Sequence, residues 1–582
     1  MGGLSASHGS ICAILANRFN IVMTMPKSIL RACSLILTLA LSACIVESLD
    51  QDLQQLQMQQ VTPASGASNV TPDQVVTVEF SDELDPAGLT ADKVQLLDSE
   101  SNPVAVTLAS SGNKLFLTPS LPLVLTGSYK LWLSAELKGK NTLAMGEVKQ
   151  SPFSVRDGIW SSPLQIAGTG TGKQIQWQHH AQGNKGNAIL LWESRTVVNG
   201  VVTSNELYAA AFNAGSFGWL RPLVLQQNTG LITIPAQARV LNDNNAIAIW
   251  QRSDSSGSSQ IIASRYLAQN DAWEASKLIS AADGISSSPR LFLDQTGNLL
   301  ATWLYKPSSS STQQAYASRY LTTSNQWSTP LRLDSDNQSN SIVCCSVGSD
   351  KSGNLSVSWQ ASQSGAGKQA VWNRRYAASQ QAWLAAEQIS PAIPAINGET
   401  TIQLSGSGHA IVGWNGSTDG SNAYPLSAVQ SSDSLRWGEV KSLSETAILA
   451  GLVSVNKDGN SGTWLSWVQN KQLFARKFDA ASGEFLAATA GLALPNFLSA
   501  SGMAQDGSGG AWLLWLDYKD SAYIGSASMV RLNKTGSFST AAQFGDKNEF
   551  SGVSDLRLDA ANGRAVVGWV DANGRILARH FH

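Results

Sequence analysis

Short runs in which apolar and polar residues alternate follow one another along most of the chain, and turn residues separate them. Residues 129–133, with the sequence YKLWL, are one such run. Strict alternation places successive side chains on opposite faces of a β-strand. Several short strands at regular spacing are typical of a β-sandwich. We therefore expect an all-β protein whose first folded part, residues 62–155, is a sandwich.

From residue 156 onward the apolar pattern repeats, and tryptophan marks the repeat. A first column of tryptophans recurs every 48 to 58 residues, at Trp192, Trp250, Trp303, Trp359, Trp414, Trp467, Trp515 and Trp569. A second column of aromatic residues alternates with it, at Trp160, Trp219, Trp273, Trp327, Trp383, Trp437, Phe485 and Phe538. Self-similarity with a period of this length indicates copies of one supersecondary unit.

Each copy of the repeat has room for four strands. In the third copy they are residues 289–293, 298–303, 315–320 and 326–333, with turn residues between them. Four strands in each unit are typical of the blades of a β-propeller, whereas a parallel β-helix has a much shorter period. We therefore expect a β-propeller over residues 156–582.

The two ends of the repeat region complement each other. The last copy has three strands, the third at residues 576–581, and lacks a fourth. Residues 158–166 carry Trp160 of the second column and can supply that strand. A blade completed in this way leaves no open sheet edge. We expect an eight-bladed ring closed by an N-terminal strand; seven blades is the alternative, because the copy that ends near Phe485 is short.

Residues 1–43 contain an export signal if translation starts at Met25 rather than Met1. Lys27 and Arg31 precede an apolar block at residues 35–41, and small residues follow the block. A basic region, an apolar block and small residues in this order are typical of a secretory signal peptide. The block is far shorter than the roughly 20 residues that span a membrane as a helix.

Residues 41–44, with the sequence LSAC, resemble the lipobox of bacterial lipoproteins. The resemblance implies cleavage before Cys44, attachment of lipid such as palmitate to that cysteine, and anchorage in a membrane. The next residue is Ile45, and under the sorting rule of Gram-negative lipoproteins a residue other than Asp there implies the outer membrane. The alternative is an ordinary signal peptide in which Cys44 is incidental.

Residues 44–61 are polar and glutamine-rich, with too little apolar surface to fold alone, so we expect a tether there. After it, the motifs VEFS at 78–81, LDP at 84–86 and GSY at 127–129 resemble the Ig-like domain of bacterial S-layer and surface proteins. The resemblance covers residues 62–155, and it implies a spacer without an active site.

Composition limits the classes of partner and the source of stability. Removing residues 1–43 takes away three of the 40 basic residues and no acidic one, which leaves 37 against 42 and a net charge of −5. A mildly acidic chain lacks the basic face that nucleic acid requires, so no nucleic-acid partner is expected. Only Cys344 and Cys345 follow Cys44, so the fold must depend on a large core rather than on many disulfides.

Basic residues precede aromatic ones in several copies, as Arg265-Tyr266, Arg319-Tyr320 and Arg375-Tyr376, with Lys477-Phe478 and His580-Phe581 as variants. Sialidases, which are propellers, bind a carboxylate with an arginine cluster. Because these pairs recur with the period of the repeat, we interpret them as structural. The hairpin from Ser431 to Trp437 resembles the sialidase Asp-box but lacks its glycine, so the resemblance carries no catalysis.

The other reactive side chains define no site. His179 and His180 are adjacent and point to opposite faces of a strand, so no metal site is expected, and no cofactor. Cys344 and Cys345 are interpreted as small residues that pack a strand, with a vicinal disulfide as the alternative. Three acids follow first-column tryptophans without any sign that they converge: Glu193, Asp517 and Asp571.

We therefore expect no catalytic residue and assign one functional position, Cys44. The preferred hypothesis is a non-enzymatic envelope lipoprotein whose propeller loops or central channel hold a protein or a glycan. The alternatives are a carbohydrate-active enzyme, either a sialidase-like hydrolase or a lyase, and a structural partner in an envelope assembly. Two carboxylates, or arginine with tyrosine or glutamate, at the channel mouth would favour the enzyme.

Overall fold

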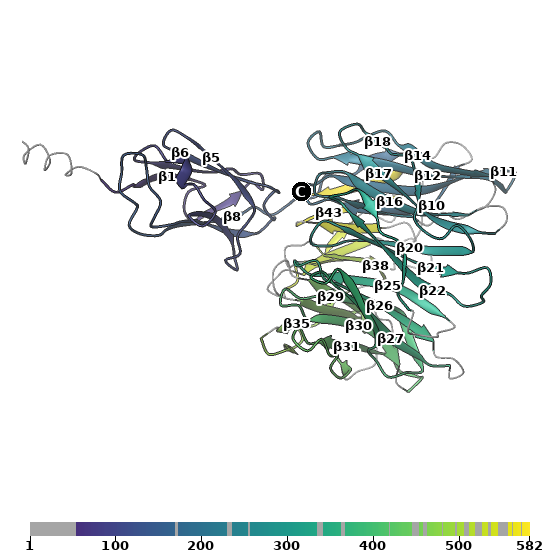
Figure 1. Ribbon diagram of the computed structural model, residues 1–582. Helices are drawn as coiled ribbons and strands as arrows, with labels where there is room; N and C mark the ends of the chain where they lie inside the picture. Colours follow the sequence, from purple (N-terminus) through teal and green to yellow (C-terminus); the bar gives the residue numbers. More distant parts are fainter. Residues whose placement is uncertain are drawn as a thin grey trace, which may run out of the picture.

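The computed structural model describes residues 54–582 except for 169–172, 230–235, 254–256, 335–340, 363–366, 418, 445–452, 458–462, 480, 495–496, 506–510, 518–526, 533–536, 545–556, 562 and 572. The described residues are all-β, with a single 3-10 turn, η1 (Pro86–Gly88), and no α-helix. None of their helical segments could cross a membrane. The strands form an N-terminal sandwich and a ring that lie side by side (Figure 1).

The sandwich consists of two four-stranded sheets, with the strand orders β1-β3-β6-β5 and β2-β8-β7-β4. Its strands are β1 (Met58–Thr62), β2 (Ala67–Val70), β3 (Val76–Phe80), β4 (Val94–Asp98), β5 (Val106–Ser111), β6 (Lys114–Pro119), β7 (Ser128–Leu133) and β8 (Lys149–Val155). Burial alternates strictly along β3, where Val76, Val78 and Phe80 are buried. Alternation of this kind is expected of a sheet with one face on the core.

The sandwich begins earlier than the sequence predicts. β1 pairs with β3 in antiparallel fashion, and Leu56, just before it, is buried in the sandwich core. Leu56 and all of β1 except Thr62 lie in segment 44–61, so the prediction of a tether is wrong for residues 56–61. Composition misleads here because an edge strand needs little apolar surface: Gln59 and Gln60 are exposed while their backbone belongs to the sheet.

The ring follows, and the strands of each repeat copy pair in antiparallel order. The first copies comprise β10 (Lys173–Gln182), β11 (Ala188–Val198), β12 (Val201–Asn213), β13 (Gly218–Trp219) and β14 (Leu223–Thr229); β15 (Ala236–Val240), β16 (Ala246–Ser253), β17 (Ser259–Leu267), β18 (Ala272–Trp273) and β19 (Lys277–Leu278); and β20 (Ile285–Leu293), β21 (Leu299–Lys306), β22 (Gln314–Leu321), β23 (Gln326–Trp327) and β24 (Leu331–Arg332). The second and third copies share a sheet only through the pair Ser259 and Ile285.

The next copies have the same order. They comprise β25 (Ile342–Ser349), β26 (Leu355–Ser362), β27 (Gln369–Ala377) and β28 (Ala382–Gln388); β29 (Ala395–Leu404), β30 (Ala410–Ser417), β31 (Tyr424–Gln430) and β32 (Lys441–Ser442); β33 (Val453–Lys457), β34 (Thr463–Gln469), β35 (Gln472–Asp479), β36 (Glu484–Phe485) and β37 (Leu492–Ala493); and β38 (Phe497–Gln505), β39 (Ala511–Asp517), β40 (Ala527–Leu532) and β41 (Ala542–Phe544). The short copy that ends near Phe485 therefore forms a sheet of its own.

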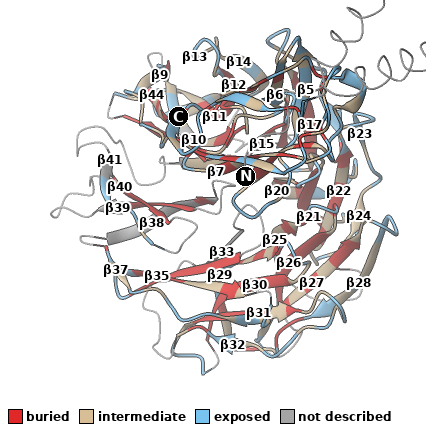
Figure 2. Ribbon diagram, turned by 90° about the vertical axis from the view of Figure 1, so that its left-hand side faces the viewer, coloured by how far each residue is buried: buried red, intermediate tan, exposed pale blue. Residues whose placement is uncertain are grey.

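The last sheet joins the two ends of the repeat region. It contains β42 (Arg557–Ala561), β43 (Arg564–Val570) and β44 (Ile576–Phe581), and β9 (Leu164–Ala167) pairs with β44 as the fourth strand. Trp160 also bridges Phe581, so the predicted N-terminal closing strand is confirmed. First strands of most neighbouring sheets contact each other, β25 contacts β21 and β22 of the preceding sheet, and β42 returns to β10. This is the architecture of a β-propeller, and Figure 2 shows the sheets around a common centre.

The two aromatic columns occupy two layers of the ring. Each first-column tryptophan lies on the second strand of its copy and is at most 3% exposed. Trp303, for example, packs with Ile247 and Ile249 of the preceding copy. Second-column residues are half-buried on the outer strands, and Trp273 of β18 packs on Tyr266 with ring centroids 5.3 Å apart. The periodic aromatic residues therefore form the packing between and along the sheets.

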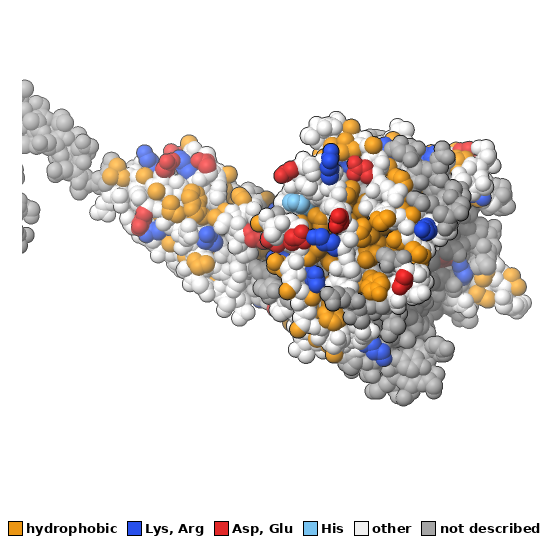
Figure 3. All heavy atoms as spheres, turned by 90° about the horizontal axis from the view of Figure 1, so that it is seen from below, with side chains coloured by type: hydrophobic (Ala, Val, Ile, Leu, Met, Phe, Trp, Pro, Cys, Tyr) orange, Lys and Arg blue, Asp and Glu red, His pale blue; other side chains and the backbone are white. Residues whose placement is uncertain are grey.

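The sandwich and the ring share one hydrophobic cluster, to which Leu125 contributes from the sandwich and Trp569 and Phe581 from the ring. Gly158 lies in this contact, where an added Cβ would stand 2.5 Å from Phe581 Cε1 and 2.8 Å from Leu125 Cδ1. The end of β44 also lies at the junction (Figure 1). On the face seen in Figure 3, acidic and basic side chains lie near one another close to the junction.

Candidate functional site

The first strand of each sheet lines the centre of the ring, and several of these strands carry charged or polar side chains. The set comprises His179 on β10, Arg239 on β15, Arg290 on β20, Glu399 on β29 and Asp559 on β42. Each keeps some exposure to solvent, as residues in the wall of a channel do. We call these five residues the channel cluster.

Arg239 reaches the channel because of strand alternation. Its neighbours Ala238 and Val240 are buried in the blade, so the side chain between them points to the other face. Its Nη1 donates a hydrogen bond to the carbonyl oxygen of Ala238 at 2.8 Å and lies 3.2 Å from Nε2 of His179. Nε2 of His179 also lies 3.3 Å from the carbonyl oxygen of Ala238, so this nitrogen faces both a donor and an acceptor.

No carboxylate among the described residues forms an ion pair with Arg239, although Asp559 attracts it from a greater distance. Surrounding protein buries the guanidinium and lowers the pKa of Arg239; Asp559 opposes this shift and Arg290 adds to it. The arginine nevertheless stays charged at physiological pH, because its ordinary pKa is above 12. Arg239 is therefore an enclosed cation without an anion in contact.

Asp559 occupies the same level of the channel as Arg239. In the strand register, Arg239 lies opposite Ile247 and Asp559 lies opposite Val566. Each of these opposite residues lies three places before a first-column tryptophan. In the sheet between them that position is held by Ala181, which is uncharged and fully buried.

The carboxyl group of Asp559 is held by the neighbouring strand. Its Oδ2 accepts a hydrogen bond from the backbone N–H of Gln182 at 2.7 Å. Burial raises the pKa of Asp559, while Arg239 and the hydrogen bond from Gln182 act in the opposite direction. Acids with raised pKa values are common in proton-transfer sites, and they also occur in structural networks.

An ion pair between Arg290 and Glu399 links β20 to β29. β25 lies between these two strands in the ring. The ion pair therefore spans β25 and does not join neighbouring first strands. They are 34% and 52% exposed, so solvent screens the pair and its contribution to stability is small. Its location is more informative, since it places both charges where a ligand in the channel would lie.

The channel cluster thus combines two guanidinium groups, two carboxyl groups and an imidazole. Guanidinium groups bind carboxylates and phosphates through paired N–H donors. Glu399 already occupies Arg290, which leaves Arg239 as the cation available to an anionic ligand. The sequence gives no signal for the four charged members, because each stands at an inner-strand position that other copies fill differently.

The repeated basic residues lie between sheets instead. The guanidinium of Arg319 lies 4.2 Å from the ring centre of Tyr376 in the next sheet and 3.6 Å from Oδ2 of Asp294. Arg375 donates to Oε1 of Gln430, again in the next sheet, at 3.0 Å. Cation–π contacts and hydrogen bonds of this kind join neighbouring blades. The structural interpretation of these arginines is confirmed.

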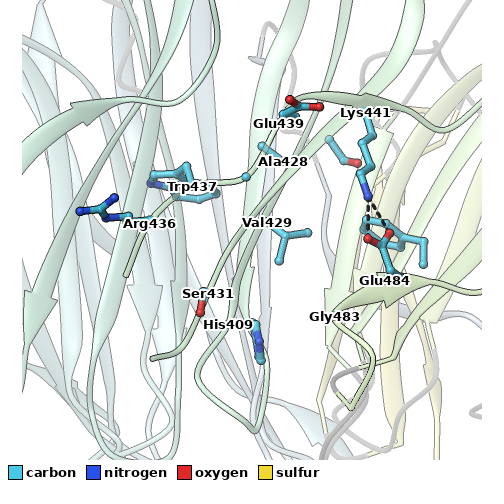
Figure 4. Close-up of a pocket in the computed structure, with 13 residues that line it drawn as sticks. His409, Ala428, Val429, Ser431, Arg436, Trp437, Glu439, Lys441, Gly483 and Glu484 are labelled. Atoms are coloured by element: carbon cyan, nitrogen blue, oxygen red, sulfur yellow. Dashed lines mark hydrogen bonds and ion pairs between the residues drawn. The ribbon is translucent and has the colours of Figure 1, made fainter. Parts of the chain in front are cut away.

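The hairpin that resembles an Asp-box borders a cavity of about 510 Å³ (Figure 4). Nζ of Lys441 pairs with Oε2 of Glu484 at 2.7 Å across this cavity, and both side chains are more than half exposed. Arg436 points away from this ion pair in Figure 4. Glu439 also lines this cavity, while Glu484 is already paired with a cation, and we place no function there.

The acids that follow first-column tryptophans act locally. Glu193 is fully buried and accepts hydrogen bonds from Nε of Arg195 at 3.1 Å and Nδ2 of Asn205 at 3.0 Å. Asp571 accepts from two backbone N–H groups in the turn after β43. The side chain of Asp517 lies outside the described residues. Glu193 and Asp571 are therefore engaged by their own strand or turn.

The adjacent histidines point to opposite faces, as predicted. His179 contacts Arg239, whereas His180 is 3% exposed and fills the space beside Gly568, where an added Cβ would stand 1.8 Å from its ring. Across the described part of the chain, no three His, Cys, Asp or Glu side chains gather as metal ligands would.

Cys344 and Cys345 form a vicinal disulfide on β25. The preferred interpretation as unlinked residues is therefore wrong, although both are buried as expected, at 6% and 7% exposure. The strand register shifts between Cys344 and Ser346, and such a bulge interrupts the alternation that would separate neighbouring side chains. Cys44, by contrast, lies outside the described residues.

Comparison with known families identifies the sandwich. Residues 52–155 match the model of the bacterial Ig-like domain, so the sandwich belongs to that family, as the motifs predicted. The match begins ahead of β1, in agreement with the burial of Leu56. No curated protein matches the chain.

Several solved structures resemble the chain at low identity. Polysaccharide lyase Uly1 is 11% identical, over 63% of this chain and 91% of that chain, with a TM-score of 0.39. The GH93 α-L-arabinofuranosidase of Fusarium graminearum is 15% identical, over 58% and 98%, with a TM-score of 0.33. The β-propeller domain of the Trilobed protease from Pyrococcus furiosus is 10% identical, over 65% and 98%, with a TM-score of 0.38. Likenesses of this size carry no conclusion about what this chain binds.

Proposed function

We propose that this protein is a lipid-anchored envelope protein whose propeller binds an acidic glycan through the channel cluster. The observation that carries the proposal is Arg239, an enclosed guanidinium in the channel wall that pairs with no described carboxylate. An enclosed charge without a counter-ion costs free energy. A ligand carboxylate would remove that cost, which makes Arg239 a candidate for binding an anionic ligand.

An acidic glycan fits the whole cluster better than a simple anion does. Its uronate carboxylate would bind Arg239, while its hydroxyl groups would donate to Asp559 and Glu399. In this proposal the Ig-like domain separates the ring from the membrane. Binding groups on a rigid ring are well positioned without any conformational change.

We also propose that the ring has eight blades. Support comes from the separate set of strands in each copy, from the copy that begins with β10 to the one that begins with β42. The copy between Trp467 and Phe485, whose short length suggests seven blades, has strands β33 to β37. Residual dipolar couplings or a crystal structure of the ring would count the blades, and seven inner strands would contradict the proposal.

The anchor rests on residues 35–45, with an apolar block, the LSAC motif and Ile45. Cys44→Ser should move the protein from the outer-membrane fraction to the soluble envelope fraction and abolish incorporation of labelled palmitate. Ser48→Thr, which keeps the cysteine and lies outside the LSAC motif, is the matched control for general effects on export. Membrane association that persists in Cys44→Ser would contradict lipid anchorage.

Glycan binding can be measured with the soluble Cys44→Ser chain titrated with polygalacturonate, and with dextran as an uncharged comparison. We expect saturable binding of polygalacturonate alone. Arg239→Gln should weaken it by roughly tenfold or more, since a charge-assisted hydrogen bond contributes about 1.5–3 kcal/mol. Arg252→Gln is the matched control, because Arg252 is exposed at the far end of β16. Equal affinity for dextran, or no effect of Arg239→Gln, would contradict the proposal.

A second candidate function, a glycan lyase, is favoured by Asp559 and His179 beside Arg239. In an elimination, Arg239 would stabilise the uronate carboxylate, His179 would take the adjacent ring proton, and Asp559 would protonate the departing glycosidic oxygen. The raised pKa of Asp559 suits the last step. Unsaturated chain ends formed from polygalacturonate, and lost in His179→Asn without loss of binding, would establish this activity over simple binding.

A further inference from the structure

A second cavity, of about 170 Å³, lies where the Ig-like domain meets the ring, and none of the channel cluster lines it. Asp73 and Arg156 reach it from the Ig-like domain. Lys185 reaches it from the turn after β10, and Arg564 from the start of β43. The cavity therefore lies between charged groups of both domains.

Arg564 is the unusual member of this cavity. The residue is 8% exposed, and its Nη1 is buried without a hydrogen-bond partner. Among the described residues it has no ion pair, and burial lowers its pKa while the more distant Asp73 opposes that shift. A buried guanidinium without a partner is costly, because its lost hydration is not replaced. The site is therefore incomplete as it stands.

The other charges around the cavity favour an anion with two negative charges. Lys185, like Arg564, has no ion-pair partner among the described residues, and Arg156 donates to the carbonyl oxygen of His582 at 3.2 Å. Asp73 is the single acidic side chain among the lining residues, and it is exposed. His580 is 3% exposed and covers one side of the cavity. Two unpaired cations match a phosphate dianion better than a carboxylate.

We propose that this cavity binds a phosphate group that links Arg564 and Lys185 of the ring to Arg156 of the Ig-like domain. Guanidinium and ammonium groups are both common ligands of phosphate oxygens. The bound phosphate would satisfy Nη1 of Arg564 and hold the two domains in one orientation. This inference concerns a different cavity from the channel cluster and does not depend on glycan binding.

The test is calorimetric titration of the soluble Cys44→Ser chain with inorganic phosphate, in a chloride background of constant ionic strength. We expect saturable binding and a rise in the unfolding temperature, since a ligand that binds only the folded state stabilises it. Arg564→Gln should weaken phosphate binding by roughly tenfold or more. Arg221→Gln, an exposed arginine of the same first copy, is the matched control and should bind as the parent chain does.

A second set of variants distinguishes a phosphate site from a site in which Asp73 is simply the counter-ion of Arg564. Asp73→Asn removes the competing acid, so phosphate should bind several-fold more tightly. Lys185→Gln provides the comparison if Arg564→Gln fails to fold, and should also weaken binding. Unchanged affinity in both Lys185→Gln and Asp73→Asn, or a thermal shift no larger than chloride gives, would overturn the proposal.

Two further ligands identify the source of the phosphate. Glucuronate, a monoanion, should bind more weakly than inorganic phosphate, and equal affinity would overturn the assignment of a dianion site. Vesicles of phosphatidic acid in phosphatidylcholine should compete with inorganic phosphate if the natural source is a lipid headgroup. Vesicles that leave phosphate binding unchanged would assign the site to a free phosphate or to a soluble phosphate ester.

Discussion

Between the sheets, one residue type occupies the same place in copy after copy, whereas the channel wall changes at every copy. First-column tryptophan fills its position throughout the ring and is buried there. The equivalent wall position is the first-strand residue that lies opposite the residue three places before each first-column tryptophan. It varies from copy to copy, in chain order Ala181, Arg239, Phe292, Gly348, Gln403, Asn456, Ala504 and Asp559. The same space must be filled between each two neighbouring blades, and a tryptophan fills it in every copy.

The channel wall has no such common requirement, so charge can be placed at single positions. Arg239 and Asp559 stand at the same level on either side of Ala181. A residue that departs from the repeat therefore points to function, and one that follows it points to packing. Four measurements test this contrast.

The largest loss in the free energy of unfolding is expected for the first-column tryptophans. Trp414 is 0% exposed, so Trp414→Ala should lower the free energy of unfolding by about 3–5 kcal/mol through lost burial and a cavity. Trp383→Ala, in the half-buried second column, should cost clearly less. Guanidinium denaturation of the soluble chain compares the two. Equal losses would mean that the columns do not form separate layers.

Gly568→Ala tests the contact between the first and last copies. The added Cβ would stand 1.8 Å from Cε1 of His180, so we expect a loss of about 1–3 kcal/mol from overpacking. In a His180→Ala background the same substitution should cost much less, because the clash is gone. A double-mutant cycle from denaturation curves measures this coupling, and additive losses would show that His180 does not fill the site.

His580 is a variant of the repeated basic residue, and burial lowers its pKa to about 3 from 6.5, with His582 adding to the shift. The folded state thus binds this proton less readily than the unfolded state. The stability from neutral His580 is complete above pH 6.5 and falls by about 1.4 kcal/mol per pH unit as the pH drops from 6.5 toward 3.

His580→Phe should flatten this dependence while keeping the ring that stacks on Phe212 at 3.8 Å. The measurement is the free energy of unfolding of both chains at several pH values below 6.5. The difference between the chains is the test, because Asp559, with its raised pKa, acts in the opposite sense in both. Parallel pH profiles would contradict the burial of a neutral imidazole.

The smallest effect on stability is expected in the channel. Glu399 pairs with Arg290 but is 52% exposed, so Glu399→Gln should change the free energy of unfolding by no more than roughly 0.5 kcal/mol. The same substitution should alter polygalacturonate affinity, because it releases Arg290. A loss of stability as large as that of Trp383→Ala would make the ion pair structural and remove the contrast.

The parts of the fold that the sequence predicts are those with periodic causes. Turn residues and two aromatic columns indicate the strands of the ring, and Trp160 indicates the closing strand, which pairs with β44. The start of the sandwich is missed because the exposed glutamines of β1 give no apolar signal. The disulfide of Cys344 and Cys345 is missed because a bulge, which the sequence does not mark, brings neighbours to one side.

The candidate site is hidden for a different reason. Arg239 and Asp559 are far apart in the sequence, and only the register of β15 and β42 places them at one level. In the sequence, a single arginine on an apolar strand looks like any exposed residue. Only the closed ring shows which residues it faces. Comparing equivalent positions across copies would nevertheless have singled them out, since both replace small or uncharged residues.

Ring closure by β9 also determines how the molecule carries mechanical load. The segment that leaves the Ig-like domain runs through Gly158 and Trp160 directly into the strand that completes the last sheet. Tension between the two domains is therefore transmitted to the hydrogen bonds of β9 with β44, and to the aromatic contact of Trp160 with Phe581 at 5.3 Å. The strand that closes the ring is therefore also the strand that receives any pull from the Ig-like domain.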